Sequence, residues 1–166
     1  LFNANLKKWV SKKAMKACLS ILITLNRTAA EVMSGFDIHA ATDVTGFGLA
    51  GHGFEMAKAS RVCLEISIKD LPIMDEALAV YKRGMTTGVN AYNRQMVEQH
   101  LRIETDLPSW HEEIVFDPQT SGGLLFAVAK TQGENLVDAL HAKGVTAAKI
   151  VGDVRELKAE IYLKFR

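Results

Sequence analysis

Apolar residues recur every three or four positions over residues 6–34, which predicts an amphipathic helix at the start of the chain. This apolar stripe consists of Leu6, Trp9, Val10, Ala14, Ala17, Cys18, Ile21, Leu22 and Leu25. The lysines between these positions predict a solvated basic face on the same helix. We expect the helix to pause near residues 26–28 and to end at Gly35.

Further along the chain, alternating and helical patterns predict two strand–helix–strand units. In chain order their predicted elements are a strand at 38–42, a helix reaching about Ser60, a strand at 62–68, and then a strand at 124–129, a helix at 132–143 and a strand at 147–154. One more strand is expected at 160–165. Two such units, separated by an insertion, resemble the split pattern of a ferredoxin-like sheet.

The insertion between the two units predicts short helices at 74–83 and 94–101, with loops at 84–93 and 105–123. Flanking periodic segments lie too close for these loops to be interdomain linkers. The predicted fold is therefore an α/β (α+β) domain, residues 1–166, with helices packed on a mixed sheet.

Composition narrows the functional classes. The chain has 166 residues, of which 48% are hydrophobic and 23% charged, as expected for one globular domain. Its net charge of +1 gives no reason to expect nucleic acid or a membrane surface as a partner. The apolar stretch 17–25 is too short to span a bilayer. Cys18 and Cys63 have no metal or redox spacing, which predicts buried thiols in a reducing cytoplasm.

A glycine-rich turn follows the strand at 38–42. Gly46, Gly48 and Gly51 satisfy the dinucleotide-binding pattern, and Glu65 lies about where a ribose-binding acid would lie. However, Asp43 is only three residues before Gly46 and would crowd a pyrophosphate, and the chain lacks further parallel units. A dinucleotide site is therefore disfavoured.

The same turn still suits a phosphate group. Glycines allow a ligand to approach the backbone closely, and the following helix presents free N–H groups. Asp43 could hold Mg²⁺, which prefers carboxylate oxygens together with substrate phosphates. The alternative is that Asp43 or Thr45 caps the helix and that the glycines serve packing. The residues alone slightly favour this alternative.

A second loop combines hydroxyl groups and glycines directly before the strand at 124–129. Its candidate residues are Asp117, Gln119, Thr120, Ser121, Gly122 and Gly123. Such a run can form an anion-binding concavity, or it can be a turn whose side chains bond their own backbone. Composition alone favours the turn.

Together these segments resemble a known family. His39-Ala-Ala-Thr-Asp-Val-Thr-Gly-Phe-Gly-Leu-Ala-Gly-His52, with Glu55-Met56, resembles one signature of the selenophosphate synthetases (selenide, water dikinases). Phe116-Asp-Pro-Gln-Thr-Ser-Gly-Gly-Leu-Leu125 resembles the second, and Lys149-Ile-Val-Gly-Asp-Val154 resembles the C-terminal strand. The resemblance extends from about Met15 to the end of the chain.

The resemblance implies the C-terminal domain of an aminoimidazole ribonucleotide synthetase-like enzyme, cytoplasmic and usually homodimeric. Such an enzyme makes selenophosphate from selenide and ATP and releases AMP and phosphate. Its N-terminal domain, which carries the reactive cysteine or selenocysteine, a lysine and most Mg²⁺ ligands, is not matched here. Cys18 and Cys63 do not match the catalytic position. We therefore expect this chain alone to be inactive.

The resemblance also implies individual roles. Asp43 matches the aspartate by which this domain reaches a Mg²⁺ ion on the ATP phosphates, and Thr42, Thr45 and Gly46 would be its neighbours on the phosphate side. The loop at 117–123 would face the same cleft. The family's Pro-Gly-Gly-Thr-x-x-Asn run reads Met85-Thr-Thr-Gly-Val-Asn-Ala-Tyr-Asn-Arg94 here, so the shape of that loop stays open.

Two other functions stay open. One is a related synthetase acting on a purine or thiamine precursor, which would be expected to lack the Asp117–Gly123 run. The other is a non-catalytic binding or assembly module. His39 and His52 are expected to be structural, because a lone histidine more often packs or caps than reacts.

Overall fold

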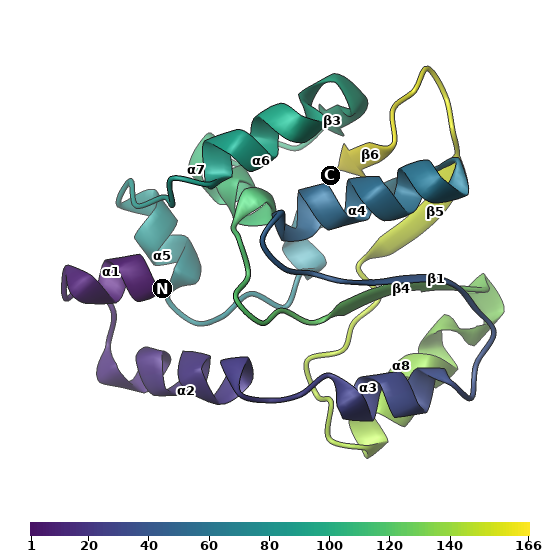
Figure 1. Ribbon diagram of the computed structural model, residues 1–166, viewed down its shortest axis with the longest axis horizontal. Helices are drawn as coiled ribbons and strands as arrows, with labels where there is room; N and C mark the ends of the chain where they lie inside the picture. Colours follow the sequence, from purple (N-terminus) through teal and green to yellow (C-terminus); the bar gives the residue numbers. More distant parts are fainter.

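The computed structural model describes all residues, 1–166 (Figure 1). Its helices are α1 (Phe2–Leu6), α2 (Lys12–Leu22), α3 (Arg27–Met33), α4 (Gly48–Ser60), α5 (Ala77–Lys82), α6 (Asn90–Val97), α7 (Ser109–Glu112) and α8 (Gly133–Ala142). Its strands are β1 (Ile38–Asp43), β2 (Val62–Ile66), β3 (Leu101–Ile103), β4 (Leu124–Val128), β5 (Gly152–Glu156) and β6 (Leu163–Phe165). Short 3₁₀ turns lie at 68–70, 98–100, 113–116 and 130–132.

The strands form two sheets. β1 and β4 make an antiparallel pair, and a four-stranded mixed sheet has the order β3-β6-β2-β5. The two predicted units are β1-α4-β2 and β4-α8-β5. Their corresponding strands pair, since β1 pairs with β4 and β2 with β5, both antiparallel. The predicted α/β class with helices on a mixed sheet is confirmed, although each unit divides its strands between the two sheets.

Helix α4 lies against both sheets and joins them into one core. It is rich in small buried residues, including Ala50 and Ala57, so strands can approach it closely. Leu64 and Ile66 of β2 and Phe165 of β6 belong to the same core cluster. Figure 1 shows α4 on one side of the β1–β4 pair and α3 with α8 on the other side. The β1–β4 pair is therefore a middle layer between helices.

The N-terminal segment departs from the predicted single helix at 6–34, which is wrong in its continuity. Lys8 has a left-handed φ of 57°, which a helix interior does not allow. The Ser11 side chain then accepts a hydrogen bond from the Ala14 N–H at 3.1 Å and starts α2 afresh. The expected pause is confirmed by the break between α2 and α3, which lies at residues 23–26, slightly earlier than the predicted 26–28.

The insertion is more regular than predicted. Helix α6 begins at Asn90, inside the predicted loop 84–93, and the end of the predicted helix 94–101 is a 3₁₀ turn leading into β3. The predicted loop 105–123 contains α7 and a second 3₁₀ turn. Strand β3 has only three residues and exists because it pairs in parallel with β6.

Cys18 and Cys63 are buried free thiols, as predicted. Loss of solvation on burial raises the pKa of both thiols. None of the helices is both long enough and apolar enough to cross a bilayer.

Replacing Leu163 tests the core. The Leu163 side chain is 0% exposed, and we expect Leu163→Ala to lower the free energy of unfolding by about 2–5 kcal/mol. Leu6 is 83% exposed, so Leu6→Ala should change the unfolding free energy by less than about 0.5 kcal/mol. Urea unfolding followed by circular dichroism measures both, and equal losses in the two variants would contradict this core.

Candidate functional site

The two signature loops lie side by side because β1 and β4 pair. Asp43, the last residue of β1, is opposite Leu124, the first residue of β4. Beyond the strands, the Val44 N–H donates to the Gly123 carbonyl at 2.9 Å, and the Gln119 N–H donates to the Thr45 carbonyl at 3.0 Å. The loops at 44–47 and 117–123 thus form one interlocked structure, which we call the paired loops.

Glycines make this interlocking possible at two positions. A Cβ at Gly122 would lie 2.0 Å from the Val44 carbonyl oxygen, so no other residue fits there without moving the loops. Gly48 has a φ of 68°, and a Cβ there would lie 2.9 Å from the backbone carbon of Phe116. Gly46 differs, since no atom lies within 4 Å of an added Cβ. Gly46 and Gly123 are therefore the two glycines of the paired loops with open space beside them.

Two asparagine side chains stabilise the paired loops by donating hydrogen bonds to backbone carbonyls. Asn26 Nδ2 donates to the Gly122 carbonyl at 2.8 Å. Asn93 Nδ2 donates both to the Gly46 carbonyl at 2.9 Å and to the Phe116 carbonyl at 3.0 Å. Asn93 is 0% exposed, and its Oδ1 has no hydrogen-bond partner. The sequence reasoning missed this role, although an asparagine survives at the end of the altered 85–94 run.

Asp117 is occupied by hydrogen bonds within the chain. The Tyr81 hydroxyl donates to Asp117 Oδ1 at 2.5 Å, and Gln119 Nε2 donates to Asp117 Oδ2 at 2.9 Å. Asn90 Nδ2 donates to the Tyr81 hydroxyl oxygen at 3.2 Å. Burial, and then the nearby Asp117 charge, raise the pKa of the Tyr81 hydroxyl far above its usual value. The Asp117 carboxylate is therefore held by the side chains of Tyr81 and Gln119, and not by the bonds to its own backbone that the turn interpretation predicts.

The altered 85–94 run has a defined shape. Asn90 Oδ1 accepts from the Thr87 N–H at 3.2 Å and from the Thr87 hydroxyl at 2.6 Å, which fixes the chain just before α6. Arg94 then pairs with Glu113 at 2.6 Å. Helix α6 is thereby held against the segment that precedes the second loop.

The alternative that Asp43 or Thr45 caps α4 is wrong. The N-cap residue of α4 is Phe47, and no side chain makes a capping hydrogen bond there. The Thr45 hydroxyl lies instead 3.0 Å from His52 Nε2. Asp43 is exposed, on the same face of β1 as His39, whereas Thr42 lies on the opposite face and its hydroxyl donates to the Asp43 carbonyl at 3.1 Å.

The two histidines differ in their surroundings. His52 is 9% exposed, and its Nδ1 lies 3.1 Å from Glu55 Oε2. His39 is exposed and lies 3.6 Å from the Asp37 carboxylate. Both contacts are compatible with the structural roles predicted for these residues.

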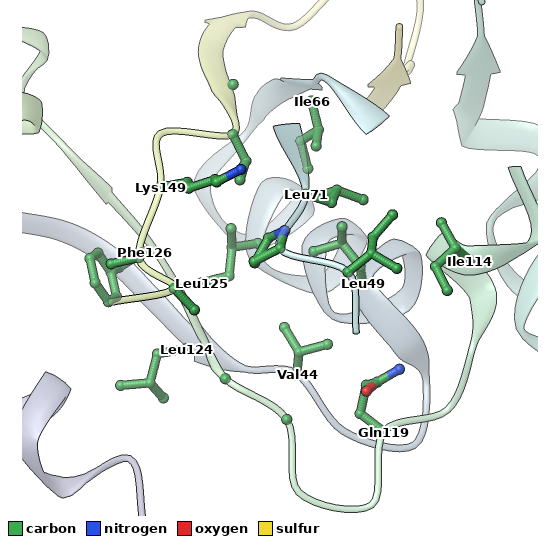
Figure 2. A pocket seen from close by; sticks show the side chains of 18 of the residues that line it. Val44, Leu49, Ile66, Leu71, Ile114, Gln119, Leu124, Leu125, Phe126 and Lys149 are labelled. Atoms are coloured by element: carbon green, nitrogen blue, oxygen red, sulfur yellow. The ribbon is translucent and has the colours of Figure 1, made fainter. Parts of the chain in front are cut away.

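A large apolar cavity borders the paired loops. It has a volume of about 1580 Å³ and is lined mainly by hydrophobic side chains. Figure 2 shows Val44 and Gln119 at its loop end, and Leu125 and Lys149 farther along its wall. Thr120 and Gly123 are exposed on the second loop.

A magnesium ion fits this arrangement only if groups outside this chain supply most of its ligands. No three histidine, cysteine, aspartate or glutamate side chains gather anywhere in the chain. Asp43 is an exposed carboxylate at the end of β1, directly before the paired loops. Mg²⁺ commonly binds one or two protein carboxylates together with phosphate oxygens and water, so one ligand from this chain suits an ion completed by other groups.

The dinucleotide interpretation fails on topology. β1 and β2, which would flank the glycine turn in one parallel sheet, belong to different sheets. Glu65 lies 3.1 Å from Arg166 and 3.8 Å from Arg155, on the face of the four-stranded sheet that α4 does not cover. Its carboxylate serves an ion-pair network of that sheet.

Fold and site together define a mixed α/β domain in which two β–α–β units bring two glycine-containing loops together. Residues 6–163 match the family described as "AIR synthase related protein, C-terminal domain", and the chain belongs to this family. The predicted resemblance is thereby confirmed at the level of the family and of its named relatives.

Curated relatives are named selenide, water dikinases. The chain is 41% identical over 145 residues to selenide, water dikinase 2 of Peptoclostridium acidaminophilum, which covers 87% of this chain and 42% of the relative. It is 39% identical to the Rhizobium meliloti enzyme (82% and 39% covered) and 37% identical to the Agathobacter rectalis enzyme (97% and 47% covered). The chain therefore spans less than half the length of these relatives.

The contact between Gly122 and Val44 can be tested with adjacent glycines. Gly122→Ala should lower the unfolding free energy by about 3 kcal/mol, because its methyl group would overlap the Val44 carbonyl. Gly123→Ala meets no atom within 4 Å and should be nearly neutral. Thermal and urea unfolding compare the two variants. A neutral Gly122→Ala would show that the loops are not in contact at this point.

The raised Tyr81 pKa predicts a loss of stability in alkali. Above the ordinary tyrosine pKa of about 10, the unfolded chain releases the Tyr81 proton while the folded chain keeps it, so this contribution to stability is full below pH about 10 and falls as the pH rises further. Tyr81→Phe should flatten this fall. Tyr92 is 61% exposed, so Tyr92→Phe is the control and should keep it. Urea unfolding across this pH range measures both.

Proposed function

We propose that this chain is the C-terminal domain of a selenophosphate synthetase. In this proposal the paired loops help to close a Mg²⁺–ATP site at which selenide is phosphorylated and AMP and phosphate are released. The observation that carries the proposal is the exposed carboxylate of Asp43 at the interlocked loops of a chain 41% identical to a selenide, water dikinase. The names of the curated relatives favour selenide over a purine or thiamine precursor.

Asp43 is the proposed Mg²⁺ ligand. Its backbone is held by the pairing with Leu124, and the next residue bonds to Gly123, so the carboxylate starts from a fixed point. Phosphoryl transfer depends on positioning and on neutralising charge at the phosphates, and a bound Mg²⁺ supplies that neutralisation. The remaining ligands would come from ATP and from the rest of the protein.

The residues proposed to lie near the phosphate differ in whether a phosphate group can still reach their polar atoms. Gly46 is exposed and has open space beside it, so a phosphate group can approach its backbone. The hydroxyls of Thr42 and Thr45 are already engaged within the chain. Of these three residues, Gly46 therefore fits a phosphate contact best.

The remaining parts of the proposal concern the whole protein. The reactive cysteine or selenocysteine and most metal ligands would belong to an N-terminal domain, so this chain alone should be inactive. We propose a homodimer that works in the cytoplasm. A non-catalytic assembly module would instead show no dependence of activity on Asp43.

The first functional test replaces Asp43 in the full-length protein. We expect Asp43→Asn to lower selenide-dependent AMP formation at limiting Mg²⁺ by at least about 10-fold and to raise the Mg²⁺ concentration needed for half activity, because a charged ligand is lost. Asp138→Asn changes another exposed aspartate, on α8, and should behave as wild type. Wild-type Mg²⁺ dependence in Asp43→Asn would overturn the proposed metal site.

A further inference from the structure

A line of hydrogen bonds runs from the surface to the paired loops. Glu55, whose side chain is 55% exposed, has Oε2 3.1 Å from His52 Nδ1. The other ring nitrogen, Nε2, lies 3.0 Å from the Thr45 hydroxyl oxygen. All three side chains belong to α4 and the loop before it, and Thr45 lies only two residues after Asp43.

The Glu55 carboxylate determines which ring nitrogen of His52 carries the proton. An ionised carboxylate only accepts hydrogen bonds, so His52 Nδ1 must carry a proton. In the neutral ring Nε2 is then bare and accepts, which leaves the Thr45 hydroxyl as the donor. Thr45 therefore donates a hydrogen bond to His52, and His52 donates one to Glu55.

Thr45 and His52 are also held by contacts outside this line. The Thr45 carbonyl accepts from the Gln119 N–H at 3.0 Å and from the Gly48 N–H at 2.9 Å. The Phe47 ring lies against the His52 ring, with 5.3 Å between the ring centres. The backbone of Thr45 and the ring of His52, which lie at the two ends of the Thr45–His52 hydrogen bond, are thus both held in place.

From this geometry we propose that His52 is a positioning residue. By accepting a hydrogen bond from the Thr45 hydroxyl it orients the hydroxyl proton toward itself, and the Thr45 oxygen, two residues after Asp43, is left free to accept. An acceptor suits the water of a hydrated divalent cation, because metal-bound water donates hydrogen bonds. It does not suit a phosphate oxygen, which is itself an acceptor. The part of this inference that concerns a cation rests on the proposed function. It assigns the Thr45 hydroxyl to the water shell of the metal ion instead of to the phosphate group.

The ring form can be measured without any ligand. In full-length protein labelled with ¹⁵N-histidine at pH 8, where an ordinary imidazole is neutral, two-bond ¹H–¹⁵N spectra should show His52 protonated on Nδ1 and bare on Nε2. His52→Gln identifies the signals by their loss. A ring protonated on Nε2, or on both nitrogens, would overturn the proposal.

A matched pair of variants tests the part played by Glu55. The amide of Glu55→Gln can either donate or accept, so the preference for the Nδ1 proton should weaken and a mixture of the two ring forms should appear. Glu134→Gln alters an exposed glutamate on α8 and should leave the His52 signals unchanged. Unchanged His52 signals in Glu55→Gln would show that Glu55 does not orient the ring.

The Mg²⁺ dependence of the full-length enzyme tests the consequence. Thr45→Val and His52→Leu should raise the half-activating Mg²⁺ concentration by about three- to tenfold, the range expected for one hydrogen bond, with little change in the KM for ATP. Thr45→Ser and His52→Gln keep an oxygen at the needed position and should stay near wild type. If Thr45→Val instead raises the KM for ATP alone, Thr45 contacts phosphate and the proposal fails.

The two proposals fail in different ways. If Asp43→Asn keeps the wild-type Mg²⁺ dependence while His52 shows the expected ring form, the metal site is overturned and the part of this inference that concerns a cation falls with it. If Asp43→Asn loses Mg²⁺ affinity while Thr45→Val keeps it, the metal site stands and the role given to His52 is overturned.

Discussion

The antiparallel pairing of β1 with β4 is the constraint on which the candidate site depends. It brings Asp43 opposite Leu124 and lets the two following loops bond through Val44 and Gly123. The approach is so close that Gly122 has no room for a Cβ. Connecting loops are usually mobile, whereas the loop after Asp43 is fixed by a neighbouring strand and by a second loop. Positioning by a rigid frame is what phosphoryl transfer requires of a protein.

The frame extends into the core through α6. Asn93 is fully buried and ties Gly46 of the first loop to Phe116 before the second, yet its Oδ1 has no partner. The Asn93 amide nitrogen thus holds the two loops together. Tyr81 similarly holds Asp117, since its hydroxyl donates to the Asp117 carboxylate and accepts from Asn90. Asn93 and Tyr81 both belong to the insertion between the two β–α–β units, which gives the insertion a role in shaping the site.

The elements that sequence reasoning predicted well carry a strong local signal. β1, α4, β4 and α8 were all predicted close to their observed bounds, and the first three flank the paired loops. β3 could not be predicted, because three residues have no usable period and the strand depends on pairing with β6. The role of Asn93 was missed for the same reason: its partners are backbone carbonyls far along the chain, which leave no mark in the sequence. The residues alone made Asp43 a possible Mg²⁺ ligand but slightly favoured a helix cap, and only the family resemblance made the ligand the preferred interpretation.

The structure at the start of α4 distinguishes between a metal-ligand and a helix-cap interpretation of Asp43. A helix whose first turn follows threonine and aspartate would ordinarily use one of them as its N-cap, a contribution of about 1 kcal/mol. Here the cap position is Phe47, without a side-chain cap, while Thr45 is bonded to His52 and Asp43 is exposed. Local rules of this kind are typically broken where a site needs the side chains for something else. The uncapped helix start is therefore compatible with the proposed ligand role of Asp43, and it leaves the Thr45 hydroxyl free to bond His52 inside α4.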